Sequence, residues 1–163
     1  MTNFFNKNSK ISKLASIEVS KKNTKIIIGA FSVIDDFVKI KCVGGEGDII
    51  IGKYVYINSG TVLYSGNGIE IGDNIMIGPN CSIVPVNHEF KNKKKLIREQ
   101  GFQLTKNGVK IEDDVWIGAN VVILDGAVIR KGSVIGSNSL VISETEAYSI
   151  NFGSPLRKVG FRK

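Results

Sequence analysis

His88 is the only histidine of the chain and the residue best suited to proton transfer near neutral pH. It stands where the regular segment 83–87 gives way to a long polar stretch. A neutral imidazole can take a proton from an alcohol while the alcohol oxygen attacks a thioester carbonyl. His88 is therefore a candidate for a general base. The alternative is a surface histidine without a function.

Other residue types that carry chemistry are sparse. Cys42 and Cys81 lie far apart and form no CxxC pair, so the sequence predicts neither a disulfide framework nor a zinc site. A single histidine also supplies too few ligands for a catalytic zinc, and we expect no metal. Cys81 falls at an inward position of a six-residue repeat, which favours a core residue over a nucleophile.

Composition restricts the class of protein. The chain has 163 residues, 42% of them hydrophobic, which fits one domain with a core. No apolar run has the length that a secretory signal or a membrane span needs, so we expect a cytoplasmic protein. The net charge of +7 favours an anionic partner: nucleic acid, a membrane surface in peripheral contact, or a phosphorylated small molecule. Because the basic residues are not interleaved with stacking aromatics, we predict no nucleic acid.

An aliphatic side chain recurs at every sixth position. The period is unbroken through Ile111, Ile117, Ile123, Ile129, Ile135 and Val141. It also holds in three shorter blocks: Ile28, Ile34 and Ile40; Ile51, Ile57 and Leu63; and Ile71, Ile77 and Ile83. The position directly after the aliphatic residue is often glycine. The position four residues after the aliphatic one is usually small or β-branched, as at Val55, Thr61, Val115, Val121 and Ala127. Two positions in six are therefore predicted to face inward.

A period of six fits neither an α-helix nor a simple strand, whose apolar spacings are three to four and two. It fits a solenoid with a triangular coil, in which each corner is a tight bend where glycine takes a positive φ or lets two backbones approach. Stacked coils bury a column that no single coil could bury alone. We predict an all-β parallel solenoid in one domain, 1–163, with coils at 26–88 and 109–143, an extended loop at 89–108, an irregular leading segment at 1–25 and a C-terminal tail at 144–163.

Three stretches resemble a known family. They are IGDNIMIGPNCSI at 71–83, the run 109–143 that contains DVWIG, and FGSPLRKV at 152–159. They resemble the hexapeptide-repeat transferases, in particular the galactoside, maltose and polysaccharide O-acetyltransferases of bacteria. The resemblance implies a left-handed parallel β-helix, acetyl-CoA as co-substrate, and a homotrimer with the coenzyme in the groove between two β-helices. The left hand would be an exception to the usual right-handed crossover.

The resemblance also implies acceptor-binding and catalytic residues. His88 matches the family's catalytic histidine, and Asn58 matches an asparagine that contacts the acceptor. Trp116 matches a tryptophan beside the active site, with a packing residue on a coil face as the alternative. Asn87, next to the histidine, and Gln100, in the REQG motif of the loop, are further candidates for acceptor contacts.

Five residues are implied for coenzyme binding. Ala119 and Ser137 match positions whose backbone lines the channel for the pantetheine arm, and Gly118 or Ala119 is the candidate for a backbone N–H that stabilises the oxyanion. Arg157 and Lys158 match basic residues near the coenzyme phosphates, where an arginine fork can bind two phosphate oxygens.

The chain departs from the family pattern around the acceptor. Ser65 and Gly66 stand where sugar-acetylating relatives carry acidic residues, so the acceptor stays open. No aspartate adjoins His88, and its imidazole could be oriented by Glu89, a backbone carbonyl or a group from another subunit. The loop carries a cluster of cations that is either a solvated arm or a lid for an anionic sugar: Lys91, Lys93, Lys94, Lys95 and Arg98.

These features predict an acetyl-CoA-dependent O-acetyltransferase that modifies a sugar hydroxyl by direct transfer, in bacterial surface-polysaccharide biosynthesis, on a small sugar or a lipid-linked glycan. One rival is an N-acyltransferase of an amino sugar carried on a nucleotide. Such enzymes usually have an additional N-terminal nucleotide-binding domain, for which we expect no room in this chain. The other rival is a silent β-solenoid scaffold, which would tolerate His88→Ala without loss of function.

Overall fold

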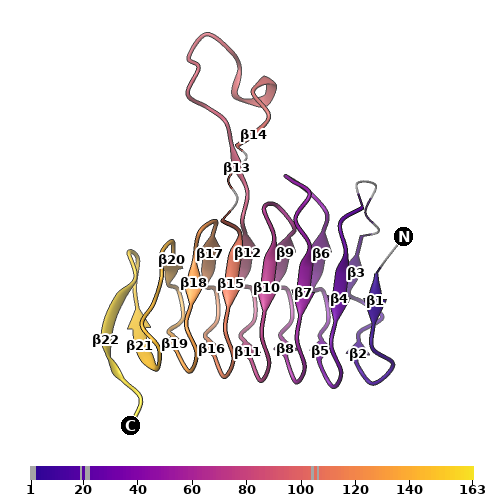
Figure 1. The fold of residues 1–163 in the computed structure, drawn as a ribbon, viewed down its shortest axis with the longest axis vertical. Coiled ribbons are helices and arrows are strands. Elements are labelled where there is room, and N and C mark those ends of the chain that lie inside the picture. The colour runs from indigo at the N-terminus through magenta and orange to yellow at the C-terminus, as the bar shows by residue number, and fades with distance from the viewer. Residues whose placement is uncertain (1–2, 19, 21–22, 104, 106) are drawn as a thin grey trace.

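Short parallel strands follow one another around a three-sided prism (Figure 1). The computed structural model describes residues 3–18, 20, 23–103, 105 and 107–163. Each turn of the chain contributes one strand to each of three sheets, which we name A, B and C in chain order. Successive turns stack in parallel register along the prism, so the coil is the repeating unit of the fold.

Within each sheet the strands lie side by side along the prism in chain order. Sheet A holds β1 (Phe4–Phe5), β4 (Ile26–Ile28), β7 (Ile49–Ile51), β10 (Ile69–Ile71), β15 (Val109–Ile111) and β18 (Val128–Ile129). Sheet B holds β2 (Lys10–Ile11), β5 (Val33–Ile34), β8 (Tyr56–Ile57), β11 (Met76–Ile77), β16 (Trp116–Ile117), β19 (Val134–Ile135), β21 (Ser149–Phe152) and β22 (Arg157–Phe161). Sheet C holds β3 (Ser16–Ile17), β6 (Lys39–Lys41), β9 (Val62–Tyr64), β12 (Ser82–Val84), β17 (Val122–Leu124) and β20 (Leu140–Val141).

An aliphatic column fills the interior of the prism. All of the residues named for the six-residue period are buried, and none of them is more than 3% exposed. The fourth positions after them, from Val55 to Ala127, are buried as well. The predicted inward pattern is therefore confirmed, because stacking the coils removes both positions from water.

Most corners of the prism use a left-handed residue three places after an aliphatic one. Asn74, Asn120 and Asn138 have φ angles of 59°, 57° and 59°. Asparagine tolerates this region better than most residues. Glycine directly after the aliphatic residue has another purpose, since a Cβ on Gly118 would lie 2.6 Å from the backbone nitrogen of Ser137. Of the two reasons predicted for glycine, close approach of backbones is the one that applies there.

Both ends of the chain are more regular than predicted. The leading segment, 1–25, contains β1, β2 and β3, which form a first coil in register with the second. Its description as irregular was wrong, because the period of six is present in Phe5, Ile11 and Ile17. The C-terminal tail forms β21 and β22, an antiparallel pair that extends sheet B.

The loop 89–108 projects from the prism as a narrow arm (Figure 1). Its root is a two-stranded antiparallel ribbon of β13 (Asn87–His88) and β14 (Phe102–Gln103), and it also holds a short 3-10 helix, η1 (Ile97–Glu99). Leu104 and Lys106 of the predicted loop lie outside the described residues. No helix in the described part of the chain is long and apolar enough to cross a membrane.

Asp125 fixes the C-terminal root of the arm to the prism. Its carboxylate accepts hydrogen bonds from the Gly108 N–H at 3.0 Å, from the Asn67 side-chain amide at 3.3 Å and from the Thr105 hydroxyl. Asn67 also donates to the Thr105 hydroxyl at 2.9 Å. The arm therefore leaves the prism from a fixed point rather than from a loose connection.

Candidate active site

His88 stands at the root of the arm, at the edge where sheet C gives way to sheet A. Its side chain is exposed, and its ring centroid lies 4.6 Å from that of Phe102 at an interplanar angle of 33°. The contact follows from the register of the ribbon, which pairs His88 with Phe102 and Asn87 with Gln103. Because successive side chains of a strand alternate, Asn87 faces the opposite side of the ribbon from His88. The two residues predicted to meet one acceptor therefore do not share a face in this chain.

Glu89 does not orient the imidazole. Its Oε1 accepts hydrogen bonds from the backbone N–H groups of Phe90 and Lys91, at 2.9 and 3.0 Å. The Lys91 N–H, with a smaller effect from the Phe90 N–H, holds the pKa of Glu89 below its ordinary value. The carboxylate therefore stabilises the first turn of the arm.

Gln100 has a structural role in the arm. Its side-chain oxygen accepts from the Asn92 N–H at 3.1 Å, and its amide nitrogen donates to the carbonyl oxygens of Asn92 and Lys95 at 3.0 and 3.1 Å. These bonds use the oxygen and both hydrogens of the amide. The contact between Gln100 and the acceptor stays a prediction, although its polar atoms are used here to fold the arm.

Three of the predicted coenzyme residues, Gly118, Ala119 and Ser137, lie at the other long side of sheet C. This is the corner of the prism where the chain passes from sheet B to sheet C. Gly118 donates its N–H to the carbonyl oxygen of Ile135 at 2.8 Å, so this N–H is not free for an oxyanion. The Ala119 N–H instead donates to the hydroxyl of Ser137 at 3.1 Å, on the outside of the corner. A hydroxyl can rotate to another partner. Ala119 is therefore the one of the two proposed donors that remains a candidate.

Asn58 belongs to the same edge. It occupies the position after the aliphatic residue, as Gly118 does, with one coil between them. Strands in a sheet lie about 4.8 Å apart, so the two positions are separated by roughly 10 Å along the edge. The predicted acceptor residue Asn58 thus lines up with the predicted coenzyme residues and not with His88.

Cys81 is a core residue, as predicted. Its side chain is 1% exposed, and its thiol lies 3.1 Å from the carbonyl oxygen of Gly118. Burial raises the pKa of the Cys81 thiol, which disfavours the thiolate that a nucleophile needs. Among the described residues, no three side chains of histidine, cysteine, aspartate or glutamate gather as metal ligands.

Trp116 lies in a row of apolar side chains on the outer face of sheet B. The register places it between Met76 and Val134, and Tyr56 follows beyond Met76. The tryptophan is 53% exposed, so it is not part of the core. A hollow of about 240 Å³ beside it is also lined by Asn74, Asp114 and Arg162. An exposed tryptophan next to a hollow is available to a ligand or a second chain.

The two predicted phosphate-binding cations differ in their surroundings. The ammonium of Lys158 lies 2.6 Å from a carboxylate oxygen of Glu146 and 4.5 Å from the ring centroid of Phe161. Arg157 is exposed and has no ion pair with a carboxylate in the described ranges. Arg157 is therefore the better placed of the two to accept a new anionic partner.

A single chain does not bring the base and the coenzyme residues together. His88 leaves sheet C at its edge with sheet A, whereas Ala119 and Ser137 lie at the edge with sheet B. The side of the prism between these edges spans about five extended residues, or roughly 15 Å. Within one chain these predicted residues therefore lie at two different corners of the prism.

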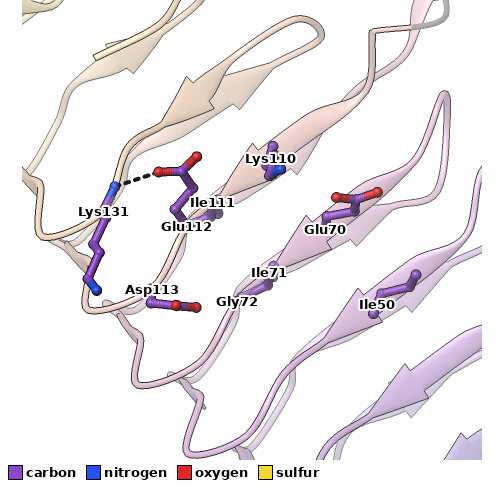
Figure 2. Close-up of a pocket in the computed structure, with 9 residues that line it drawn as sticks. All are labelled: Ile50, Glu70, Ile71, Gly72, Lys110, Ile111, Glu112, Asp113 and Lys131. Atoms are coloured by element: carbon purple, nitrogen blue, oxygen red, sulfur yellow. Dashed lines mark hydrogen bonds between the residues drawn. The ribbon is translucent and has the colours of Figure 1, made fainter. Parts of the chain in front are cut away.

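A larger hollow, of about 480 Å³, lies elsewhere, on the outer face of sheet A (Figure 2). Glu70 and Lys110 face each other across neighbouring strands there, and Glu112 accepts the backbone N–H of Lys131 at 2.9 Å. None of the residues predicted for catalysis or binding lines it. Size alone does not make it the site.

Comparison with known proteins gives the family. Residues 108–143 match the model for the bacterial transferase hexapeptide, described as six repeats. The chain is 31% identical over 170 aligned positions to a chloramphenicol acetyltransferase of Klebsiella aerogenes, which covers 98% of this chain and 77% of the relative. The chain belongs to the hexapeptide-repeat transferase family. The left-handed parallel β-helix predicted from the resemblance is thereby confirmed.

Two further relatives of this hexapeptide transferase differ in chemistry. A galactoside O-acetyltransferase of Lactococcus lactis is 35% identical over 111 residues, 68% of this chain and 52% of the relative. A variant of AntD, an N-acyltransferase of Bacillus cereus solved with dTDP-4-amino-4,6-dideoxyglucose and coenzyme A, matches with a TM-score of 0.81 at 30% identity, over 99% of this chain and 84% of that one. The chain spans about half the length of several curated relatives that it matches.

The AntD match corrects one argument from the sequence. The sequence argument was that an N-acyltransferase of this kind usually carries an additional N-terminal nucleotide-binding domain. This hexapeptide transferase instead aligns with 84% of an N-acyltransferase chain that was solved with a sugar nucleotide. The size of the chain therefore does not argue against transfer to an amine.

Two features of the site were missed from the sequence. Phe102 contacts the imidazole, and Asp125 anchors the arm. The first depends on pairing across the ribbon of the arm, and the second on hydrogen bonds between the arm and the prism. The alternation of β13 and β14 is too short, at two residues each, to be recognised from an apolar pattern.

Proposed function

We propose that the protein is a cytoplasmic acetyltransferase that moves an acetyl group from acetyl-CoA to a sugar hydroxyl, in surface-polysaccharide biosynthesis, with His88 as the general base. The observation that carries the proposal is the arrangement of sheet C: His88 projects from one of its edges, and the exposed corner of Ala119 and Ser137 follows the other. Each edge supplies one half of an acyl-transfer site. The family relatives named as acetyltransferases support this reaction class.

A cyclic trimer would unite the two halves. In a ring with threefold symmetry, each subunit meets the next through two different surfaces. Suppose that sheet C of each subunit faces the symmetry axis. The corner between sheets A and C of one subunit then meets the corner between sheets B and C of the next subunit. His88 of one subunit then lies beside Ala119 and Ser137 of the next. We therefore propose a homotrimer with three sites, one at each contact between subunits.

The outer face of sheet C supports this assembly. From β9 onward it carries mostly apolar side chains that point away from the core: Val62, Tyr64, Val84, Val122, Leu124 and Leu140. The outer face of sheet A, by comparison, carries Glu70 and Lys110 at its centre. A contiguous apolar face of this kind can form a contact with another chain, and sheet C is the face that lies between the two halves of the proposed site.

In such a site His88 would act directly on the acceptor. Its imidazole takes the hydroxyl proton while the hydroxyl oxygen bonds to the thioester carbonyl carbon. The carbon–sulfur bond then breaks, and the departing sulfur recovers the proton from His88. The Ala119 N–H, turned from Ser137, stabilises the negative oxygen. The buried Cys81 takes no part, and direct attack by the acceptor needs no covalent enzyme intermediate.

The surface near Arg157 suits the coenzyme phosphates. This arginine lies on β22, in the same sheet as Trp116 and three strands further along the prism. A coenzyme that runs parallel to the prism axis would pass from His88 of the neighbouring subunit, along Ala119 and Ser137, toward Arg157. Its guanidinium fork can bind two phosphate oxygens at once.

Transfer to an amine of a sugar nucleotide is the second candidate, and the AntD match favours it. The basic residues of the arm, Lys93 to Lys95 in particular, would attract a diphosphate in either case. A neutral amine attacks a thioester without a strong base, whereas a hydroxyl does not. We therefore expect His88→Ala to lower the rate about a hundredfold to ten-thousandfold for a hydroxyl acceptor, and less for an amine.

The first test is binding of acetyl-CoA by calorimetry, with the oligomeric state measured by analytical ultracentrifugation. Saturable binding of one acetyl-CoA per chain of a trimer supports the proposal. The release of coenzyme A thiol is then measured with galactosides and with amino-sugar nucleotides as acceptors. A folded trimer that binds no acetyl-CoA and gives no thiol would instead indicate another acyl donor or a silent scaffold.

The shared site has its own test. His88→Ala removes the base, and Ala119→Trp blocks the proposed channel, so each variant alone is expected to be inactive. When the two are unfolded together and refolded, mixed trimers contain sites with an intact His88 from one chain and an intact Ala119 from the other. Activity in the mixture supports a site between subunits. A mixture as inactive as its components indicates a site within one chain.

A further inference from the structure

The end of the prism formed by the first coil is apolar. Its inward residues are Phe5, Ile11 and Ile17, and their register partners in the second coil are fully buried. In the first coil the same positions are partly open, and Phe5 is 38% exposed. Two more apolar side chains of this coil are exposed, Phe4 at 60% and Leu14 at 56%.

The same end is strongly basic. Residues 1–25 contain six lysines and one glutamate, a net charge of 6 − 1 = +5 out of the +7 of the whole chain. The glutamate, Glu18, pairs with Lys41 of the second coil at 3.4 Å. Lys7, Lys10 and Lys13 are exposed, and no ion pair joins them to a carboxylate among the described residues.

We propose that this end of the prism binds the surface of a membrane that contains anionic lipids. The surface combines the two features that such binding needs: cations that pair with lipid phosphates, and aromatic or aliphatic side chains that enter the interfacial layer. Phe4 and Leu14 lie on the same short coil as Lys7, Lys10 and Lys13, so both kinds of side chain border this end of the prism.

The open edges of the end strands limit the depth of insertion. β1, β2 and β3 each have one neighbour in their sheets, so part of their backbone hydrogen-bonding capacity faces outward. Hydrocarbon cannot satisfy such groups, whereas phosphates and water at headgroup depth can. The proposed contact is therefore peripheral. A second copy of the chain is a poor occupant, because two ends with this charge repel each other.

Membrane binding by the first coil does not depend on the proposed acyl transfer, although the two are compatible. In a cyclic trimer the three first coils lie on the same side of the assembly, and three weak contacts act together. An acceptor attached to a lipid would then be reached without leaving the membrane.

The test is co-sedimentation of the full chain with vesicles, at low and at high salt. Vesicles of phosphatidylcholine and phosphatidylglycerol in equal parts are compared with phosphatidylcholine alone. We expect binding to the anionic vesicles, weaker binding at high salt, and little binding to the neutral ones. Absence of binding to the anionic vesicles at low salt would overturn the proposal.

Two sets of substitutions locate the contact. Replacing Lys7, Lys10 and Lys13 by glutamine removes three positive charges. This variant is expected to have a membrane partition coefficient about a hundredfold lower, since each lysine contributes about fivefold. Phe4→Ser with Leu14→Ser is expected to lower it as well, at unchanged charge. The matched control replaces Lys93, Lys94 and Lys95 of the arm by glutamine, which removes the same charge elsewhere and is expected to leave most binding intact.

Each other outcome contradicts the proposal. Equal losses from the arm control and from the first-coil variant would indicate attraction by net charge alone. Binding to soluble polyglutamate without binding to anionic vesicles would identify an acidic protein surface as the partner. Circular dichroism and thermal unfolding of every variant show that the fold is retained, so that a loss of binding reports on the surface.

Discussion

His88 and Phe102 pack ring against ring across the ribbon at the root of the arm, with centroids 4.6 Å apart. No hydrogen bond to the imidazole side chain is found among the described residues, and the adjacent Glu89 is engaged by the backbone of the arm. The Phe102 ring is therefore the contact that limits rotation of the imidazole within one chain. The proposed base must be held in position to act, so we expect this contact to affect the rate.

Phe102→Leu is expected to lower kcat about tenfold to a hundredfold, with the KM for acetyl-CoA unchanged, because the imidazole loses its orientation but the coenzyme surface is untouched. Phe102→Tyr keeps the ring and is expected to keep the rate. Since the chain has one histidine, its imidazole protons give a single set of NMR signals. The ring current of Phe102 shifts them, and the shift should disappear in Phe102→Leu.

The NMR measurement separates this prediction from the proposed reaction. Suppose that the wild type shows the ring-current shift of the His88 protons while Phe102→Leu leaves the rate unchanged. That result would mean that the contact between the two rings is structural only. If His88→Ala loses all activity and Phe102→Leu has no effect, the proposed role of His88 as base is supported and the proposed positioning role of Phe102 is excluded.

The anchoring of the arm by Asp125 predicts a second effect on the rate. Asp125→Ala removes the acceptor for Gly108 and Thr105, so the root of the arm is released and His88 moves with it. We expect about a tenfold fall in kcat and faster tryptic cleavage at the arm lysines, with little change in melting temperature. Asp125→Asn keeps one acceptor oxygen and should show a smaller effect. Unchanged rates of both cleavage and catalysis in Asp125→Ala would show that the arm is held by other contacts.

The fold was predictable because one pattern is repeated many times. Each of the residues from Ile28 to Val141 at the sixth position must be buried by the coil above and below it, so the period survives the insertions. The first coil follows the same rule at Phe5, Ile11 and Ile17, but its lysines and short strands obscured it. The family resemblance supplied the hand of the helix, which the period alone does not contain.

The site was less predictable because it depends on pairings that no periodic pattern carries. His88 was identified as a unique residue at the end of a coil, whereas the role of Gln100 was assigned from a motif and its amide is used within the arm. Gly118 was assigned as a donor although its N–H belongs to the ladder of sheet B. Such competition between a fold contact and a ligand contact can be seen only once hydrogen-bond partners are known.

The left-handed corners predict a difference between two substitutions of Asn74. Its φ angle is 59°, and it lies at the corner between sheets A and B. Asn74→Val forces a β-branched residue into this region and is expected to cost about 1 to 2 kcal/mol of unfolding free energy. Asn74→Gly removes the steric conflict and is expected to be close to neutral. Urea denaturation measures both, and equal losses would show that side-chain contacts of the asparagine matter more than its backbone.

A carboxylate that joins two coils predicts how the fold responds to acid. Glu112 accepts hydrogen bonds from the Lys131 N–H at 2.9 Å and from the Arg130 guanidinium at 2.8 Å, and Arg130 also lies 2.7 Å from Glu144. The Lys131 N–H first, and then Arg130, hold the pKa of Glu112 below its ordinary 4.5. A carboxyl group with a lowered pKa in the folded state contributes stability at pH values above 4.5, and this stability is lost as the pH falls through the folded-state pKa.

Glu112→Gln should therefore be less stable than the wild type near neutral pH, by about 1 kcal/mol for a partly exposed network. The difference should shrink as the pH falls below 4.5, because the wild-type carboxylate then becomes protonated and loses the same interactions. Glu70→Gln is the matched control, since Glu70 lies on the outer face of the same sheet and has no side-chain hydrogen bond in the described ranges. Thermal unfolding across this pH range gives both differences. A Glu112→Gln deficit that stays constant with pH would mean that shape, and not ionisation, is what the substitution removes.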